Sequence, residues 1–205
     1  MNPKKEAFRK AFIASVPILC SYLFLGMAYG ILMQEAGFGW AASLLTSAVV
    51  YTGAFQFVLI TFLSSGASIL TIAVTALFMN SRQSFYALTF LNDFKAMGKR
   101  RPYMIHSLTD ETYAVNCTLE SLPPAERRET MFYLAVLSHF YWTAASVLGG
   151  MLGQIIDTFV NSVYVFDDRV VLNFNFTDDA KTVTREEVLG SSAVDNAPPK
   201  QEPLT

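Results

Sequence analysis

The sequence predicts an all-α, multi-pass membrane protein with broken or re-entrant helices, followed by a short soluble β-hairpin and a disordered C-terminal tail. Two observations predict this fold class. Hydrophobic residues make up 52% of the 205-residue chain and gather into apolar segments within residues 1–156, and some of these exceed the about 20 residues that a membrane-spanning helix needs. Residues 157–205 are more polar, so we expect a transmembrane domain and a separate soluble tail.

The first apolar segment, residues 11–33, carries no charge and would extend about 34 Å as a helix, enough to cross a hydrocarbon core about 30 Å thick. Basic residues precede it, as in a signal peptide, but it is too long for a signal-peptide core and further apolar segments follow. We therefore expect a retained first helix. Gly26 and Gly30 share one face of it, and either allow a second helix to approach closely or are ordinary glycines of a membrane helix.

Two further apolar segments, residues 40–63 and 68–91, lie between this helix and a basic loop at residues 92–102. Basic regions flanking membrane helices face the cytoplasm, and the N-terminus is also basic. Three full crossings would place the two basic regions on opposite sides, so we expect one segment to be discontinuous or re-entrant. The expected helix breaks are at Gly53 and at Ser81, since broken helices mark substrate sites in many transporters.

The next stretch, residues 103–122, has apolar residues at intervals of three and four, which predicts one amphipathic helix. Asp110 and Glu111 would lie near its start, where Ser107 and Asp110 match a capping box. The last apolar segment, residues 131–156, predicts another membrane helix. Its interface anchors would be Tyr133, Tyr141 and Trp142.

The remaining residues, 157–205, change in character. Apolar and polar residues alternate from Val163 to Phe176, a pattern typical of a β-hairpin. Residues 181–205 are polar, and we expect them to be disordered.

Five phrases in the first three quarters of the chain resemble a known family. They are Ser15-Val-Pro-Ile18 with Leu25-Gly-Met-Ala-Tyr-Gly30, Gly53-Ala-Phe-Gln-Phe57, Asn80-Ser-Arg82, and Leu108-Thr-Asp-Glu-Thr-Tyr113. Through them residues 1–155 resemble the AzlC-type branched-chain amino acid permeases, the large subunit of a branched-chain amino acid exporter. The resemblance implies a multi-pass protein of the bacterial cytoplasmic membrane that works with a small AzlD-type membrane subunit. The stretch Ile156-Asp-Thr-Phe-Val-Asn-Ser-Val-Tyr-Val-Phe-Asp-Asp-Arg-Val-Val171 and the closing Ala197-Pro-Pro-Lys200 do not fit that family. Through them residues 156–205 resemble the C-terminal end of a large serine recombinase, which points to a chimeric or truncated gene.

Arg82 is the only charged residue between Ala36 and Asn92, and a charge at the centre of a lipid-spanning helix costs roughly 2.5–3.5 kcal/mol. It therefore needs a charged partner, an aqueous cavity or a route to the interface. If the chain exports a zwitterionic aliphatic amino acid, as the resemblance implies, Arg82 would meet the carboxylate. Asp110 or Glu111 would then meet the ammonium group or carry a coupling proton.

Other residues would complete such a site. Gln56 and Asn80 would add hydrogen bonds, and the aliphatic pocket would be lined by Phe55, Phe57 and Phe85. Each assignment has a structural alternative: Arg82 pairs with a carboxylate only to hold the fold, Asp110 and Glu111 stabilise a helix N-terminus, or Gly53 is a packing residue rather than a hinge.

The sequence therefore favours a membrane subunit that exports valine, leucine or isoleucine and is driven by an ion gradient, because it has no phosphate-binding loop for ATP. The alternatives are a truncated or chimeric remnant that does not transport, and, third, a membrane-embedded enzyme. We expect no cofactor, no metal and no nucleic-acid partner. Cys20 and Cys117 lie far apart in the sequence, and the two histidines look isolated. We expect the N-terminus and the C-terminal tail both to face the cytoplasm.

Overall fold

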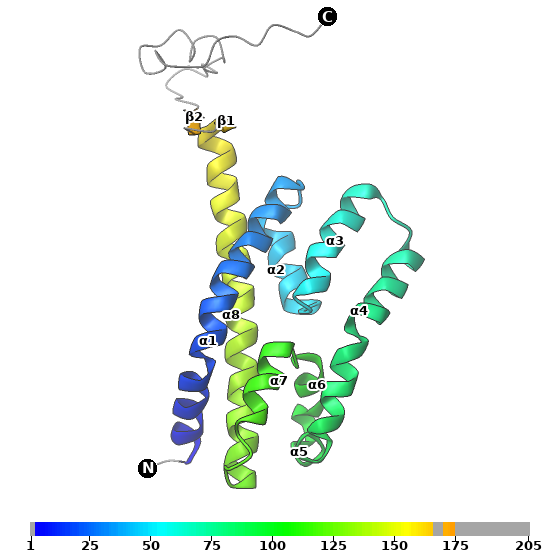
Figure 1. Ribbon diagram of the computed structural model, residues 1–205, viewed down its shortest axis with the longest axis vertical. Helices are drawn as coiled ribbons and strands as arrows, with labels where there is room; N and C mark the ends of the chain where they lie inside the picture. The colour runs from blue at the N-terminus through cyan, green and yellow to red at the C-terminus, as the bar shows by residue number, and fades with distance from the viewer. Residues whose placement is uncertain (1–2, 166–169, 175–205) are drawn as a thin grey trace, which may run out of the picture. The chain divides into compact units, whose positions relative to one another are not determined.

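The computed structural model describes residues 3–165 and 170–174, which are mainly helical (Figure 1). The chain divides into two units, Met1–Gly153 and Gln154–Thr205. Helices form the first unit: α1 (Pro3–Glu35), α2 (Gly39–Val49), α3 (Ala54–Ser65), α4 (Ile69–Thr89), α5 (Leu91–Ala96), the 3-10 turn η1 (Gly98–Arg100), α6 (Arg101–His106), α7 (Asp110–Cys117) and most of α8 (Pro124–Phe159).

Among the described helices, α1 and α8 are long and apolar enough to cross a membrane. Their backbones are in direct contact. A Cβ atom added to Gly30 would lie 2.0 Å from the carbonyl oxygen of Ser146, and one added to Gly149 would lie 2.1 Å from that of Met27. Because only glycine permits such an approach, these residues let the two helices pack along one seam.

The second apolar segment, residues 40–63, is not one helix. The chain leaves helical geometry after Val49 and resumes it at Ala54. Tyr51 and Gly53 both have positive φ angles, 43° and 51°, a conformation that strains tyrosine and that glycine adopts freely. In Figure 1 α2 runs down to this interruption and α3 runs back up from it, so the two helices form a hairpin.

The third apolar segment contradicts the predicted helix break at Ser81. α4 is continuous from Ile69 to Thr89. The hydroxyl of Ser81 donates a hydrogen bond of 2.8 Å to the carbonyl oxygen of Phe78. A serine whose hydroxyl donates to a carbonyl oxygen of the preceding turn is compatible with a continuous helix.

The prediction of one amphipathic helix over residues 103–122 is also wrong. The chain forms α6 and α7, separated by residues 107–109. Thr109 has extended backbone and caps α7: its Oγ1 accepts from the Thr112 N–H, and Thr112 Oγ1 accepts from the Thr109 N–H. The capping box is therefore Thr109 with Thr112 rather than Ser107 with Asp110. Asp110 and Glu111 consequently occupy the first turn of α7.

Two clusters of buried apolar side chains hold the first unit together. One joins α1 and α8 with the interruption between α2 and α3; the other joins the short helices α5, α6 and α7 with the beginning of α8. The first cluster contains Ala11, Ile18, Tyr22, Tyr29, Met33, Tyr51, Leu134, Tyr141 and Trp142, and the second contains Phe90, Phe94, Met104, Leu108, Leu119, Met131 and Ala135. Trp142 is therefore a core residue and not an interface anchor.

The second unit contains two strands in its described part. β1 (Val160–Val165) pairs antiparallel with β2 (Val170–Phe174), with Tyr164 opposite Val171. The predicted disorder of residues 181–205 and most of the recombinase-like end lie outside the described residues.

Candidate functional site

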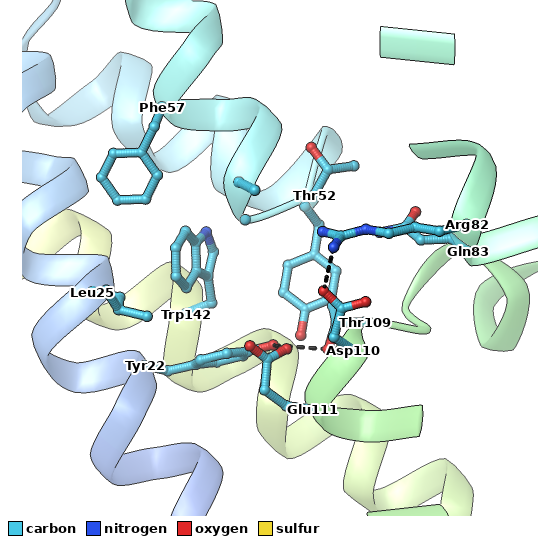
Figure 2. A pocket seen from close by; sticks show the side chains of 13 residues that line it. Tyr22, Leu25, Thr52, Phe57, Arg82, Gln83, Thr109, Asp110, Glu111 and Trp142 are labelled. Atoms are coloured by element: carbon cyan, nitrogen blue, oxygen red, sulfur yellow. Dashed lines mark hydrogen bonds and ion pairs between the residues drawn. The ribbon is translucent and has the colours of Figure 1, made fainter. Parts of the chain in front are cut away.

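A cavity of about 320 Å³ lies where α1, the interruption between α2 and α3, α4, α7 and α8 come together (Figure 2). Its size is within the range of small-molecule sites, about 300–1,000 Å³. We call it the charged cavity. It is lined by Tyr22, Leu25, Tyr51, Thr52, Gly53, Ala54, Phe57, Arg82, Gln83, Thr109, Asp110, Glu111 and Trp142.

An ion pair spans the charged cavity between α4 and α7. Arg82 Nη1 lies 2.9 Å from Asp110 Oδ2, and the two side chains are 46% and 42% exposed. Ion pairs this exposed contribute only about 0–1 kcal/mol. The structure thus brings together two of the residues singled out in the sequence, in a pair that a competing charge separates at low cost.

Glu111 is held differently, by α1. The hydroxyl of Tyr22 lies 2.8 Å from Glu111 Oε2, to which it donates, and 2.8 Å from the hydroxyl of Thr109. Tyr22 is 3% exposed. Glu111 is therefore fixed to the α1–α8 core, whereas Asp110 faces α4.

Leu25, Phe57 and Trp142 form the apolar end of the charged cavity. Figure 2 shows them on one side, with Arg82 and Asp110 on the other. The Trp142 ring packs edge-on against Tyr22, with centroids 5.2 Å apart, and against Phe57 at 6.5 Å. The cavity thus places opposite charges at one end and an apolar wall at the other.

Gln56 lies behind this wall and does not line the cavity. It is fully buried; its Oε1 accepts hydrogen bonds from Trp142 Nε1 at 2.9 Å and from the backbone N–H of Thr52 at 3.3 Å, and its Nε2 donates to Ser47 Oγ at 3.2 Å. Gln56 therefore fixes Trp142 and the backbone at the interruption, rather than presenting hydrogen bonds to a solute.

Asn80 lies outside the charged cavity, in a second cavity described below. Phe55 is buried away from the charged cavity and Phe85 is 68% exposed, so Phe57 alone of the three predicted phenylalanines lines it. Gly26 lies against α8, where an added Cβ would be 2.7 Å from that of Ala145. Gly53 lies in the helix interruption and lines the cavity.

The two histidines are neighbours, contrary to the expectation that they are isolated. The ring centroids of His106 and His139 are 6.3 Å apart, and Tyr103 Oη lies 3.3 Å from His139 Nδ1. Tyr51 stacks on His139 at 4.1 Å. Among the described residues, no group of three or more histidine, cysteine, aspartate or glutamate side chains could hold a metal ion.

Sequence reasoning missed several residues of the charged cavity. Tyr22 precedes Gly26 by four residues, so its position on the packed face of α1 was readable from the spacing. Thr109 was readable from the Thr-x-x-Thr cap. Trp142 had no such signal, because tryptophan in an apolar segment is equally typical of a membrane interface.

Comparison with known proteins supports the resemblance to the AzlC-type permeases. Residues 17–156 match the family model described as AzlC protein. An uncharacterized membrane protein of Helicobacter pylori strain 26695 is 37% identical over 154 residues, covering 75% of this chain and 68% of that protein. The branched-chain amino acid transport protein AzlC of Bacillus subtilis is 32% identical over 159 residues, covering 76% of this chain and 63% of that protein.

A more distant relative is the inner membrane protein YgaZ of Escherichia coli, 27% identical over 157 residues that cover 74% of this chain and 63% of that protein. These relatives are longer than the stretch that they share with this chain. No solved structure gives a significant match.

Proposed function

The chain belongs to the AzlC family, and from that premise we propose that it is the membrane subunit of an exporter of branched-chain amino acids. The observation that carries the proposal is the division of the charged cavity into an end with opposite charges and an apolar end. A zwitterionic amino acid with an aliphatic side chain has the same division. The name of the Bacillus subtilis relative supports the same substrate class.

The carboxylate and ammonium groups of the solute would insert between Arg82 and Asp110. Arg82 takes the carboxylate, because a guanidinium presents paired donors that match a planar anion. Asp110 takes the ammonium group. The solute replaces one exposed ion pair by two, and the pair it breaks is weak, so its opening is a small cost.

The solute's side chain would lie against Leu25, Phe57 and Trp142. Burying a valine, leucine or isoleucine side chain contributes about 1.5–3 kcal/mol. Glycine and alanine gain little or none of this. The apolar end therefore selects branched aliphatic solutes over small ones, and Gln56 maintains that selection by fixing Trp142.

The membrane arrangement that fits this site has α1, α4 and α8 crossing and α2 with α3 re-entering from one side; α4, whose most apolar stretch is less apolar than those of α1 and α8, crosses with Arg82 toward the charged cavity. This places the N-terminus and the basic loop at residues 92–102 together, on the cytoplasmic side. Three crossings put the chain after α8 on the side opposite the N-terminus, so this arrangement replaces the expectation that both ends face the cytoplasm. The N-terminus is also tied to the start of α8 by the ion pair of Lys10 with Glu126. Glu111, fixed by Tyr22, is the candidate to carry a coupling proton, and a small AzlD-type subunit would complete the assembly.

The test is valine efflux from cells that express the chain with an AzlD-type subunit and are preloaded with labelled valine. Arg82→Ala should lower efflux at least tenfold while membrane insertion stays normal. Arg101→Ala is the matched control, because Arg101 is exposed on α6 and does not line the charged cavity, and should retain wild-type efflux. Unchanged efflux in Arg82→Ala would remove Arg82 from the mechanism.

A second candidate function, a remnant that does not transport, is favoured by one observation. The family model matches residues 17–156, and residues 157–205 lie outside that match. Wild-type chain that inserts but gives no valine efflux above vector cells, while a full-length relative does in the same cells, would establish this candidate and reject export.

A further inference from the structure

A second cavity, of about 280 Å³, adjoins the charged cavity on the side of α4 and α6. Thr52 and Gln83 line both cavities. We call the second one the amide cavity, because the amide side chains of Asn80 and Gln83 are among its lining residues. It is lined by Thr52, Leu77, Asn80, Ser81, Gln83, Ser84, Ile105 and His106.

The amide cavity accounts for two polar residues of α4, Asn80 and Ser84, that do not line the charged cavity. Asn80 and Ser84 lie four residues apart, so they share a face of α4 that turns away from Arg82. Polar side chains facing lipid lack hydrogen-bond partners, which is costly, so polar residues in membrane helices generally face water or protein. Both side chains line the amide cavity, which would give them access to water.

The chemistry of the lining suits a neutral or zwitterionic solute. No aspartate, glutamate, lysine or arginine is among the described lining residues, so neither end of a zwitterion meets a fixed charge there. The amides offer both donors and acceptors, and Leu77 and Ile105 offer apolar contacts. Such a cavity binds more weakly than one with an ion pair, which is what a solute needs in order to leave.

Thr52 and Gln83 lie at the junction of the two cavities. Thr52 belongs to the strained interruption between α2 and α3, and its buried hydroxyl makes no hydrogen bond with another described residue. Gln83 directly follows Arg82 on α4, and Figure 2 shows the two side chains together beside Thr52. A solute released by Arg82 is therefore next to Gln83.

We propose that the amide cavity is a second station for the same zwitterionic aliphatic amino acid, and that Thr52 and Gln83 form the constriction between the two stations. This inference rests on the proposed export function. It adds a route, a second site and a role for Asn80 and Ser84.

Cysteine labelling tests the amide cavity without depending on export activity. In the full chain with Cys20 and Cys117 replaced by serine, Asn80→Cys and Ser84→Cys should react with a charged, hydrophilic methanethiosulfonate at least tenfold faster than Phe78→Cys. Phe78 is the matched control, because it is 74% exposed on α4 and lines neither cavity. Saturating valine should slow labelling of the first two variants at least twofold, and glutamate should not.

Two labelling results would overturn the proposal. Equal rates at Asn80→Cys, Ser84→Cys and Phe78→Cys would mean that this face of α4 meets lipid. Fast labelling that valine does not slow would mean a water-filled cavity that the solute does not visit.

Blocking the constriction separates the route from the export function itself. Gln83→Trp should lower valine efflux at least tenfold, whereas Phe85→Trp, at an exposed position of the same helix, should stay within twofold of wild type. If Gln83→Trp exports normally while Arg82→Ala does not, the proposed route is wrong and the export function stands. If Arg82→Ala also exports normally, the charged site itself is wrong, and the proposed route falls with it.

Discussion

The α1–α8 pair and α4 are built in opposite ways, although both contribute to the charged cavity. α1 buries a residue at nearly every third or fourth position and contacts α8 through its backbone at Gly30, whereas none of the residues of α4 is buried. Glu111 is fixed to α1 through Tyr22, whereas Asp110 is paired with Arg82 of α4. One side of the cavity thus belongs to a close-packed scaffold and the other to a loosely held helix.

This difference separates stability from solute handling. Substitutions in the α1–α8 seam should lower the amount of folded protein, because they remove or crowd contacts that nothing else replaces. Substitutions on α4 should leave folding nearly unchanged and alter export.

The largest effect is expected for Gly30→Leu. An added Cβ already lies 2.0 Å from the carbonyl oxygen of Ser146 and 2.5 Å from the backbone nitrogen of Gly150, so α1 and α8 would be forced apart. Overpacking typically costs about 1–3 kcal/mol, and a backbone clash should exceed that range. Thermal melting of the detergent-purified chain should show little folded protein. Ala28→Leu, on the exposed face of the same helix, should melt like wild type. An equal loss of folded protein in both variants would contradict close backbone packing of α1 against α8.

Gln56 and Gln83 give a matched comparison between the two regions. Gln56→Leu leaves the buried Trp142 Nε1–H and Ser47 hydroxyl without this partner, and an unsatisfied buried group costs about 1–3 kcal/mol. Gln83→Leu, on α4, should not change the melting temperature and should alter valine efflux instead. A greater loss of stability in Gln83→Leu than in Gln56→Leu would contradict the assignment of the α1–α8 pair as the scaffold and of α4 as the loosely held helix.

Gly53→Ala tests the strained interruption between α2 and α3. No atom lies within 4 Å of an added Cβ, so the cost comes from the φ of 51° alone and should be about 1–2 kcal/mol. Gly66→Ala has equally open space, but its φ of 66° and ψ of 32° lie in the left-handed helical region, whereas Gly53 with ψ of −97° lies outside it, so Gly66→Ala should cost less. Gly53→Ala should also slow efflux, and Gly66→Ala should not, because only Gly53 lines the charged cavity. Melting curves and valine efflux of both variants measure this difference.

The smallest effect is expected for Arg100→Ala, because the Arg100 side chain, in η1, contacts the partly exposed start of α8 away from the seam. It removes an ion pair of 2.9 Å with Glu129 and a stacking contact with the Phe132 ring at 4.1 Å. The guanidinium is 41% exposed and screened by solvent, so the loss should be no more than about 1 kcal/mol. A double-mutant cycle with Glu129→Ala, followed by thermal melting, checks this; a coupling well above that value would show that the pair organises the contact between η1 and α8.

The sequence predicted much of the polar end of the cavity and little of its apolar end. Arg82 was identifiable because a lone charge in an apolar segment demands a partner, and Asp110 followed it in the next polar stretch. Trp142 and Gln56 depend on a contact between helices 86 residues apart along the chain, which local pattern does not report.

The helix breaks show the same limit. Gly53 lies at a break because glycine tolerates the positive φ that the chain adopts there. Ser81 looked like a comparable break point, but its hydroxyl bonds the preceding turn and α4 continues. Polarity alone does not distinguish a break from a polar face, and on α4 the polar residues line cavities instead.

The most direct test of the contrast between scaffold and α4 is hydrogen exchange of the purified chain with and without saturating valine. The account predicts slower exchange with valine at residues 50–54, 80–84 and 109–111, and no change along the seam at residues 26–30 and 145–150. Protection confined to the seam, or absent throughout while valine binding is measurable, would contradict a solute site shared between the rigid pair and α4.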